Sequence, residues 1–250
     1  MIKIQSARLK ISIVIPAFNE ERLIAETLRH VNAALPAFSR RDWETELIVC
    51  DNNSTDGTAS LALAEGATVV FEPINQIARA RNTGAAAASG DWLVFVDADS
   101  QPGLGLFDEV AEQVASGRCL AGGCTVKFEA GNYVVARLIG VVWNAISRVG
   151  HLLAGSFIFC EAATFREIGG FNQDLFAAEE IDLSKRLKQV AKKTGKRIVI
   201  LHRHPLITSA RKLHLYTPRE HLLFLAKTLL VRGKTLNSRD ECSIWYDGRR

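Results

Sequence analysis

The feature that most constrains the fold is an alternation of short β-rich runs with helical segments over roughly the first hundred residues. The β-rich runs are bounded by turn residues, and amphipathic or alanine-rich stretches lie between them. Strands that alternate with helices predict βαβ units, which require a parallel sheet and right-handed crossovers. The four predicted strands cover residues 11–15, 46–50, 68–71 and 92–96.

The segments between these strands have the patterns of helices. Residues 20–35 carry an apolar stripe, and Asn19 is placed to cap that helix at its start. Ser54 or Thr55 can cap a second helix, and an alanine-rich third helix precedes the fourth strand. We therefore expect an α/β half of the nucleotide-binding type in this part of the chain.

The alternation weakens after residue 100. Strands are predicted over 120–128 and 197–201, and helices over 132–149, 178–194 and 218–231. Because no long linker is visible, we expect a single domain over residues 1–250. Within it we distinguish a donor half (about 10–100), an acceptor and catalytic half (about 101–215) and a C-terminal helical extension (about 216–250).

Composition narrows the class of protein. A hydrophobic fraction of 48% supports a large core, and a net charge of +4 is mild. No run of lysine and arginine with interleaved aromatics occurs, so nucleic acid is not an expected partner. Without metal-binding spacing, the scattered cysteines predict free thiols and a cytoplasmic location. They are Cys50, Cys119, Cys124, Cys160 and Cys242.

Two predicted apolar helices leave their surroundings open. The helices over 132–149 and 218–231 contain or are flanked by basic residues, and arginines interrupt the first, so neither is expected to span a bilayer. Such helices can pack in the core or in a homodimer contact. They can also lie in a bilayer interface, as a peripheral contact on the inner face of the membrane.

Polar segments follow the first, second and fourth predicted strands. Asn19 and Glu20 follow the first, Asp51 the second, and Asp97 and Asp99 the fourth. The carboxyl ends of parallel strands share one edge of a sheet, where ligands bind in such folds. Two carboxylates one residue apart suit a divalent cation that carries a diphosphate. The alternative is a solvated loop with two incidental acids.

Together these segments resemble the family 2 glycosyltransferases of the GT-A fold. The resemblance implies an α/β fold with a mostly parallel central sheet and helices on both faces. It also implies transfer of a sugar from a UDP- or GDP-linked donor to an acceptor, with inversion at the anomeric carbon. The motifs follow the family's order: IVIPAFNEE (13–21), VCDNNSTDGT (49–58), ARNTG (80–84), SGD (89–91), DAD (97–99), IGGF (168–171) and EEIDL (179–183).

The resemblance also implies site roles. Asp99 would be the main ligand of Mn²⁺ or Mg²⁺, with Asp97 beside it, and the cation would bind the diphosphate. The residues that would contact the donor are Pro16, Asn19, Glu20, Asp51, Arg81 and Asp97.

An inverting transfer needs a base on the face opposite the leaving group. The family usually has a Glu-Asp pair ahead of an Asp-Leu, and here that pair is Glu179-Glu180. Glu180 is the expected base, and Asp182 gains weight from this departure. The alternative is that these acids only complement the positive end of a helix.

Later residues add further hypotheses. His202 and His204 follow the last predicted strand, and His204 is a candidate metal ligand. Arg211, in the segment 208–212, is placed to close over the diphosphate. The acceptor is not identified, and enzymes of this type often use lipid-linked acceptors. Two other functions stay open: a sugar-1-phosphate nucleotidyltransferase, and an inactive nucleotide-sugar-binding scaffold.

Overall fold

The computed structural model describes residues 8–128, 134–209, 234–238 and 242. The strands are β1 (Lys10–Ala17), β2 (Glu44–Asp51), β3 (Thr68–Phe71), β4 (Trp92–Val96), β5 (Ser100–Gln101), β6 (Cys119–Phe128), β7 (Phe157–Glu161) and β8 (Arg197–Thr208). The helices are α1 (Ile24–Ala34), α2 (Pro36–Ser39), α3 (Thr58–Ala64), α4 (Ile77–Ala87), α5 (Leu104–Ala115), α6 (Val134–Gly150), α7 (Ala162–Glu167) and α8 (Glu179–Thr194), with a 3-10 turn η1 (Lys234–Asn237).

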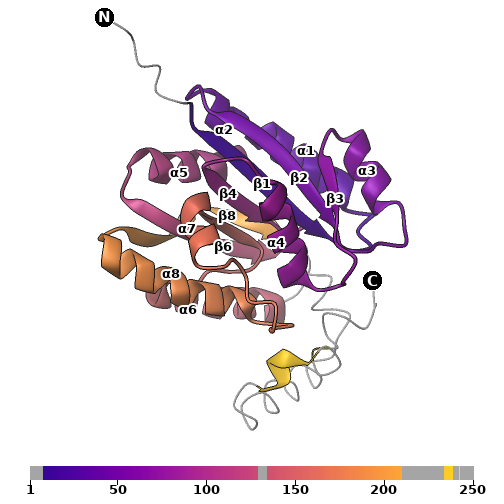
Figure 1. Ribbon diagram of the computed structural model, residues 1–250. Coiled ribbons are helices and arrows are strands. Elements are labelled where there is room, and N and C mark those ends of the chain that lie inside the picture. The colour runs from indigo at the N-terminus through magenta and orange to yellow at the C-terminus, as the bar shows by residue number, and fades with distance from the viewer. Residues whose placement is uncertain (1–7, 129–133, 210–233, 239–241, 243–250) are drawn as a thin grey trace, which may run out of the picture.

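The strands form one sheet in the order β3-β2-β1-β4-β7-β6-β8-β5. Figure 1 shows β3, β2, β1 and β4 side by side. β1 runs parallel to β2 and β4, and β2 runs parallel to β3. β4 is buried throughout and β1 almost throughout, as expected for strands with both faces covered. The strands predicted over 68–71 and 92–96 are confirmed with the same bounds.

The second half of the sheet is mixed. β7 runs antiparallel to both β4 and β6, while β6 runs parallel to β8. β5 pairs antiparallel with the end of β8. β5 and β7 therefore run opposite to the other strands of a sheet that is otherwise parallel.

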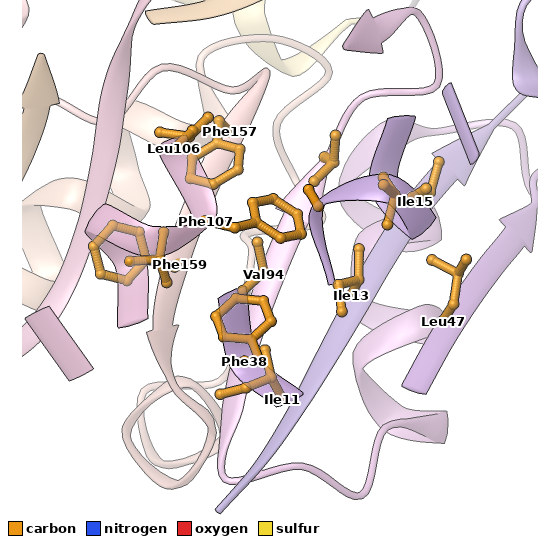
Figure 2. Close-up of a cluster of buried hydrophobic side chains, with 14 of the residues drawn as sticks. Ile11, Ile13, Ile15, Phe38, Leu47, Val94, Leu106, Phe107, Phe157 and Phe159 are labelled. Atoms are coloured by element: carbon orange, nitrogen blue, oxygen red, sulfur yellow. The ribbon is translucent and has the colours of Figure 1, made fainter. Parts of the chain in front are cut away.

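Buried clusters lie on both faces of the sheet. Successive residues of a strand point to opposite faces, so Ile13 and Val14 belong to different clusters. Around Ile13, the rings of Phe38 from α2 and Phe107 from α5 pack 5.2 Å apart, centroid to centroid (Figure 2). On the other face, Phe95 packs with residues of α4, α7 and α8. Helices therefore cover the sheet on both sides, as the fold class predicts.

Helix α4 packs unusually close to β1. A Cβ on Gly84 would lie 2.5 Å from Cγ1 of Val14, so a side chain at this position would force the helix away. The helix turns Ala78, Arg81 and Ala85 inward, where they are buried. The close packing therefore brings a guanidinium group into the interior.

Two helices start later than predicted. α1 begins at Ile24 and α3 at Thr58, and neither has a side-chain cap. The prediction that Asn19 caps the first helix, and Ser54 or Thr55 the second, is therefore wrong. Their side chains instead join the two loops in which they lie.

Strand β8 is longer than the strand predicted over 197–201. Its pairing with β6 shifts between Leu201 and Leu206, so the residues between them bulge from the ladder. His202 and His204, expected after the last strand, lie in this bulged part.

The helix predicted over 218–231 lies outside the described residues. Of the predicted C-terminal extension, the structure describes η1 and two further residues, 238 and 242. Within the described parts of the chain, no helix is both long and apolar enough to cross a membrane.

Candidate active site

The loops that follow β1 and β2 are hydrogen-bonded to each other. Asn19, which has a positive φ of 51°, donates its backbone N–H to Ser54 Oγ at 2.9 Å and accepts a bond at Oδ1 from the N–H of Thr55 at 2.8 Å. The N–H of Glu20 donates to Thr58 Oγ1 at 2.8 Å. These bonds hold Asn19 and Glu20 in place at the carboxyl edge of the sheet.

Asp51 and Pro16 lie beside these loops. Asp51 ends β2, is buried, and accepts a hydrogen bond at Oδ1 from the N–H of Ser54 at 3.1 Å. Pro16 is buried near the end of β1. Asn52 donates its side-chain amide to the carbonyl of Ile74 at 2.6 Å, which fixes the loop after β3. Asp51 thus stabilises the turn that follows β2, and its contact with the donor stays a prediction.

Arg81 is the centre of the site. It is 1% exposed, and Nη1 donates to Glu179 Oε1 at 2.5 Å. Nη2 donates to Asp97 Oδ1 at 3.0 Å and to the carbonyl of Gly155 at 2.8 Å. The guanidinium carbon lies 5.1 Å from the centroid of the Phe171 ring, and Nε is buried without a hydrogen-bond partner among the described residues.

This arginine joins four parts of the chain that are distant in sequence. They are α4, the end of β4, the segment before β7 and the first turn of α8. Burial alone would lower the pKa of Arg81, but the negative charges of Asp97, Glu179 and Glu180 outweigh it and raise the pKa. The guanidinium therefore stays charged among three carboxyl groups.

The two aspartates of the DAD motif lie in a turn at the end of β4. Asp97 is half-buried, donates its N–H to the carbonyl of Ser156 at 3.2 Å, and accepts the bond from Arg81. Asp99 is half-buried, and its carbonyl accepts the N–H of Ser209 at 3.1 Å. Backbone bonds therefore tie this turn both to the segment before β7 and to the end of β8.

Glu180 lies next to the Arg81 cluster but is held differently. Nη1 of Arg81 donates to Glu179, and Nη2 donates to Asp97 and Gly155, whereas Arg81 acts on the Glu180 carboxyl through its charge. Burial and then the negative charge of Glu179 raise the pKa of the Glu180 carboxyl well above its usual range. Such a group is a candidate general base.

Asp182 lies outside this cluster. Its Oδ2 accepts hydrogen bonds from Nε of Arg186 at 2.8 Å and from Nη2 at 2.7 Å, one helical turn away. The three acids of the first turn of α8 therefore have different surroundings. Glu179 is paired with Arg81, and Asp182 is paired with Arg186. Glu180 lies between these two acids in the sequence.

His204 lies on β8 with a carboxylate from α5. Its Nδ1 is 2.8 Å from Glu109 Oε1, which also accepts the His204 N–H at 2.9 Å. Among the residues that the structure describes, no three His, Cys, Asp or Glu side chains are grouped to hold a metal ion. Arg211 lies outside the described residues. Metal binding by His204 and diphosphate contact by Arg211 stay predictions.

Gly155 is the site residue that the sequence analysis did not select. A Cβ at this position would lie 3.3 Å from Nη2 of Arg81 and 3.7 Å from Cδ of Glu180. The glycine therefore allows the chain before β7 to approach both groups. A glycine between two apolar segments was the available signal, and it points to a turn rather than to a site.

Comparison with known proteins defines the class. A mannosyltransferase from Pyrobaculum calidifontis, solved with GDP-Man and Mn²⁺, superimposes with a TM-score of 0.65 at 20% identity over 91% of this chain and 65% of that one. That similarity establishes the fold, which is that of the GT-A glycosyltransferases. The sequence model of glycosyl transferase family 2 matches residues 12–168. The chain belongs to glycosyl transferase family 2.

Two curated relatives match part of the chain. An uncharacterized glycosyltransferase of Mycobacterium tuberculosis is 32% identical over 140 residues, which are 56% of this chain and 55% of the relative. An undecaprenyl-phosphate 4-deoxy-4-formamido-L-arabinose transferase of Pseudomonas fluorescens is 38% identical over 99 residues, 36% of this chain and 28% of the relative. The chain thus spans about half the length of the first relative and less than a third of the length of the second.

Proposed function

We propose that this protein transfers a sugar from a nucleoside-diphosphate donor to an acceptor hydroxyl, with a divalent cation and with inversion at the anomeric carbon. Membership in family 2 supports sugar transfer. The observation that carries the mechanism is the position of Glu180, beside the Arg81–Asp97 pair at the carboxyl end of β4. A proton acceptor at this position would lie next to the proposed donor site, which supports the proposal.

In the proposed reaction, Glu180 accepts the proton of the acceptor hydroxyl. The hydroxyl oxygen forms a bond to the anomeric carbon while the bond to the diphosphate oxygen breaks, and the leaving diphosphate keeps that electron pair. A carboxylate with a raised pKa holds the proton more strongly than an ordinary one, which favours its use as a base. The ion pair of Asp182 with Arg186 supports Glu180 over Asp182.

The donor would lie along the carboxyl edge of the sheet. We assign Asn19, Asp51, Pro16 and Glu20 to the nucleotide, since the loops after β1 and β2 fix their positions. Arg81 would act on the donor mainly through Asp97, because its terminal nitrogens already bond to protein oxygens. This arrangement of polar groups supports a nucleotide sugar as the binding partner.

The residues at the end of β4 suit a divalent cation. Asp97 and Asp99 would hold Mn²⁺ or Mg²⁺, since hard cations take carboxylate oxygens and commonly share their coordination with substrate phosphates. The bound cation would supply positive charge that offsets the charge developing on the leaving diphosphate. The mannosyltransferase of the same fold, solved with Mn²⁺, supports this assignment.

Nucleotide release from a panel of UDP- and GDP-linked sugars tests the proposal. With Mn²⁺ present, one donor should be turned over far faster than the rest, and chelation should stop the release. NMR of the product, once an acceptor is found, should show the opposite anomeric configuration to that of the donor. If no donor binds by calorimetry or is turned over, the proposal is wrong.

A further inference from the structure

Helix α6 exposes apolar side chains on the side away from the sheet. Val141 is 60% exposed, Val142 51%, Ile146 49% and Val149 86%. Residues spaced three, four or seven positions apart share one side of a helix, so Val142, Ile146 and Val149 form a single surface, named here the α6 face, and Val141 lies beside it. Three large apolar side chains on one exposed helical surface are unusual for a helix that packs on a sheet.

Over residues 140–150, where the side chains of α6 are described, the side that faces the protein is small and polar instead. Asn144 accepts the N–H of Val126 at 2.9 Å and donates to its carbonyl at 2.8 Å, which satisfies that residue of β6. Ser147 is buried and donates to the carbonyl of Leu152 at 2.6 Å. A helix on an ordinary water-facing surface has the reverse arrangement, with its apolar stripe turned inward.

A basic strip of α8 borders the α6 face. Lys188 donates its Nζ to the carbonyl of Gly150, the last residue of α6, and this bond identifies the flank of α8 that faces α6. Lys185 and Lys192 are exposed and lie on the same flank, three residues before and four after Lys188. The sequence of α6 contains Arg137 and Arg148 and no acidic residue. Figure 1 shows the two helices next to each other.

We propose that the α6 face and the basic flank of α8 dock on an anionic membrane surface. Apolar side chains at the acyl boundary, with cations beside them at the headgroups, are the arrangement of an interfacial helix. Each lysine near the surface adds attraction to anionic lipid. This inference concerns where the protein binds and does not depend on the proposed sugar transfer.

The proposed surface is connected directly to the candidate active site. Gly150 ends α6, and five residues later the carbonyl of Gly155 accepts the bond from Arg81. Between them, the N–H of Leu153 donates to Ser184 of α8 at 3.0 Å. Docking through the α6 face would therefore bring the Glu180 region close to the lipid, within reach of an acceptor carried by a lipid.

Flotation with liposomes tests the docking. The full chain should float with vesicles that contain phosphatidylglycerol at low salt, less so at high salt, and little with phosphatidylcholine alone. Reversing the charge of Lys185 and Lys192 (K185E/K192E) should weaken binding by about tenfold or more. K193E is the matched control, because Lys193 lies seven residues after Arg186, on the opposite flank of α8.

The contribution of the apolar side chains of the α6 face is tested with separate variants. V142D and I146D should each abolish flotation, whereas L63D should not, because Leu63 is 59% exposed on α3, away from this surface. Thermal unfolding should be the same for all of these variants, since each changes an exposed side chain. Donor turnover in solution should also be unchanged, which separates loss of docking from loss of the site.

Two results would overturn the proposal. The first is a protein that stays at the bottom of the gradient with anionic vesicles at both salt concentrations. The second is a dimer in light scattering that I146D dissociates, with no flotation of the parent chain, which would assign the α6 face to a second copy of the protein.

Discussion

At the scale of single residues, the buried guanidinium of Arg81 distinguishes the acids around it. It bonds to Glu179 and Asp97, while burial raises the pKa of the neighbouring Glu180 carboxyl. Two neighbouring glutamates therefore differ in chemistry although they adjoin in sequence. The pairing of Asp182 with Arg186 removes the competing acid from this group.

The first prediction concerns the base. Glu180→Gln keeps the side-chain volume and removes the proton acceptor, so kcat should fall by about 10²–10⁴-fold with little change in donor affinity. Asp182→Asn is the matched control and should stay within about tenfold of the parent enzyme. Steady-state kinetics and donor calorimetry measure both effects. An inactive Asp182→Asn beside an active Glu180→Gln would reverse the assignment.

The pH dependence of activity follows from the same residue. A carboxyl with a raised pKa stays protonated to higher pH, and a protonated base is inactive. The value of kcat/KM should therefore rise with pH through a limb that lies above the usual range of a glutamate. Asp182→Asn should keep that limb. A profile already flat from pH 5 upward would contradict the prediction.

A third prediction concerns the cation. Asp99→Ala removes the proposed main ligand, so Mn²⁺-dependent donor turnover should be lost while the unfolding temperature changes little. Asp99 is half-buried in a turn, whose bond to Ser209 comes from the backbone and survives the substitution. Turnover measured across a Mn²⁺ titration checks this. Parent-level activity of the variant at saturating donor would show that Asp99 does not bind the cation.

The sequence predicted the members of the site better than their contacts. Asp97, Glu179 and Glu180 were selected and lie together, but Arg81 alone on a helix also fits a surface residue. The available signal was its spacing from Ala78 and Ala85, which places the arginine on a buried alanine face. What it pairs with depends on segments far away in the chain, which local patterns do not encode.

At the scale of elements, the sequence predicts a strand correctly where the residue pattern of that strand alone is sufficient. β3 and β4 have the predicted bounds because each is a short β-rich run between turn residues. β7 was not predicted as a strand, and its reversed direction follows from pairing with both β4 and β6. The extension of β8 beyond Leu201 likewise depends on its partner β6.

The fourth prediction belongs to the start of β2, at the opposite edge of the sheet from the site. Glu46 accepts bonds from Ser12 and Ser89 and pairs with Lys10 at 2.8 Å. Burial alone would raise the pKa of Glu46, but these partners lower it to about 2. A lowered carboxyl pKa stabilises the folded state above the unfolded pKa, and this contribution is lost as the pH falls towards 2.

Glu46→Gln should therefore lower the free energy of unfolding by roughly 2–3 kcal/mol at pH 7. The difference from the parent protein should narrow steadily between about pH 5 and pH 2. Urea denaturation over this range measures it. Glu44→Gln, on the exposed start of the same strand, is the control and should change stability by less than about 0.5 kcal/mol. Equal effects of the two variants would show that the Glu46 contacts add nothing.

At the scale of the whole molecule, the candidate site lies where the two halves of the fold meet. Arg81 and Asp97 come from the parallel half, whereas Gly155 and Glu179 come from the half with the reversed strand β7. One buried side chain thus connects both halves. Its ionic contacts are buried, so removal of either charge leaves the other without a partner in the interior.

The last prediction uses this dependence. Arg81→Met should lower the free energy of unfolding by about 3–5 kcal/mol, because Glu179 and Asp97 lose their buried cation. The double variant Arg81→Met/Glu179→Met should regain part of that stability, because it removes one of the two unpaired charges as well. Neither variant should regain sugar transfer, since Asp97 is no longer held. Urea denaturation and donor turnover of the single and double variants form the cycle. A single variant within about 1 kcal/mol of the parent would mean that the two halves are held together by their apolar clusters, and that Arg81 serves the site alone.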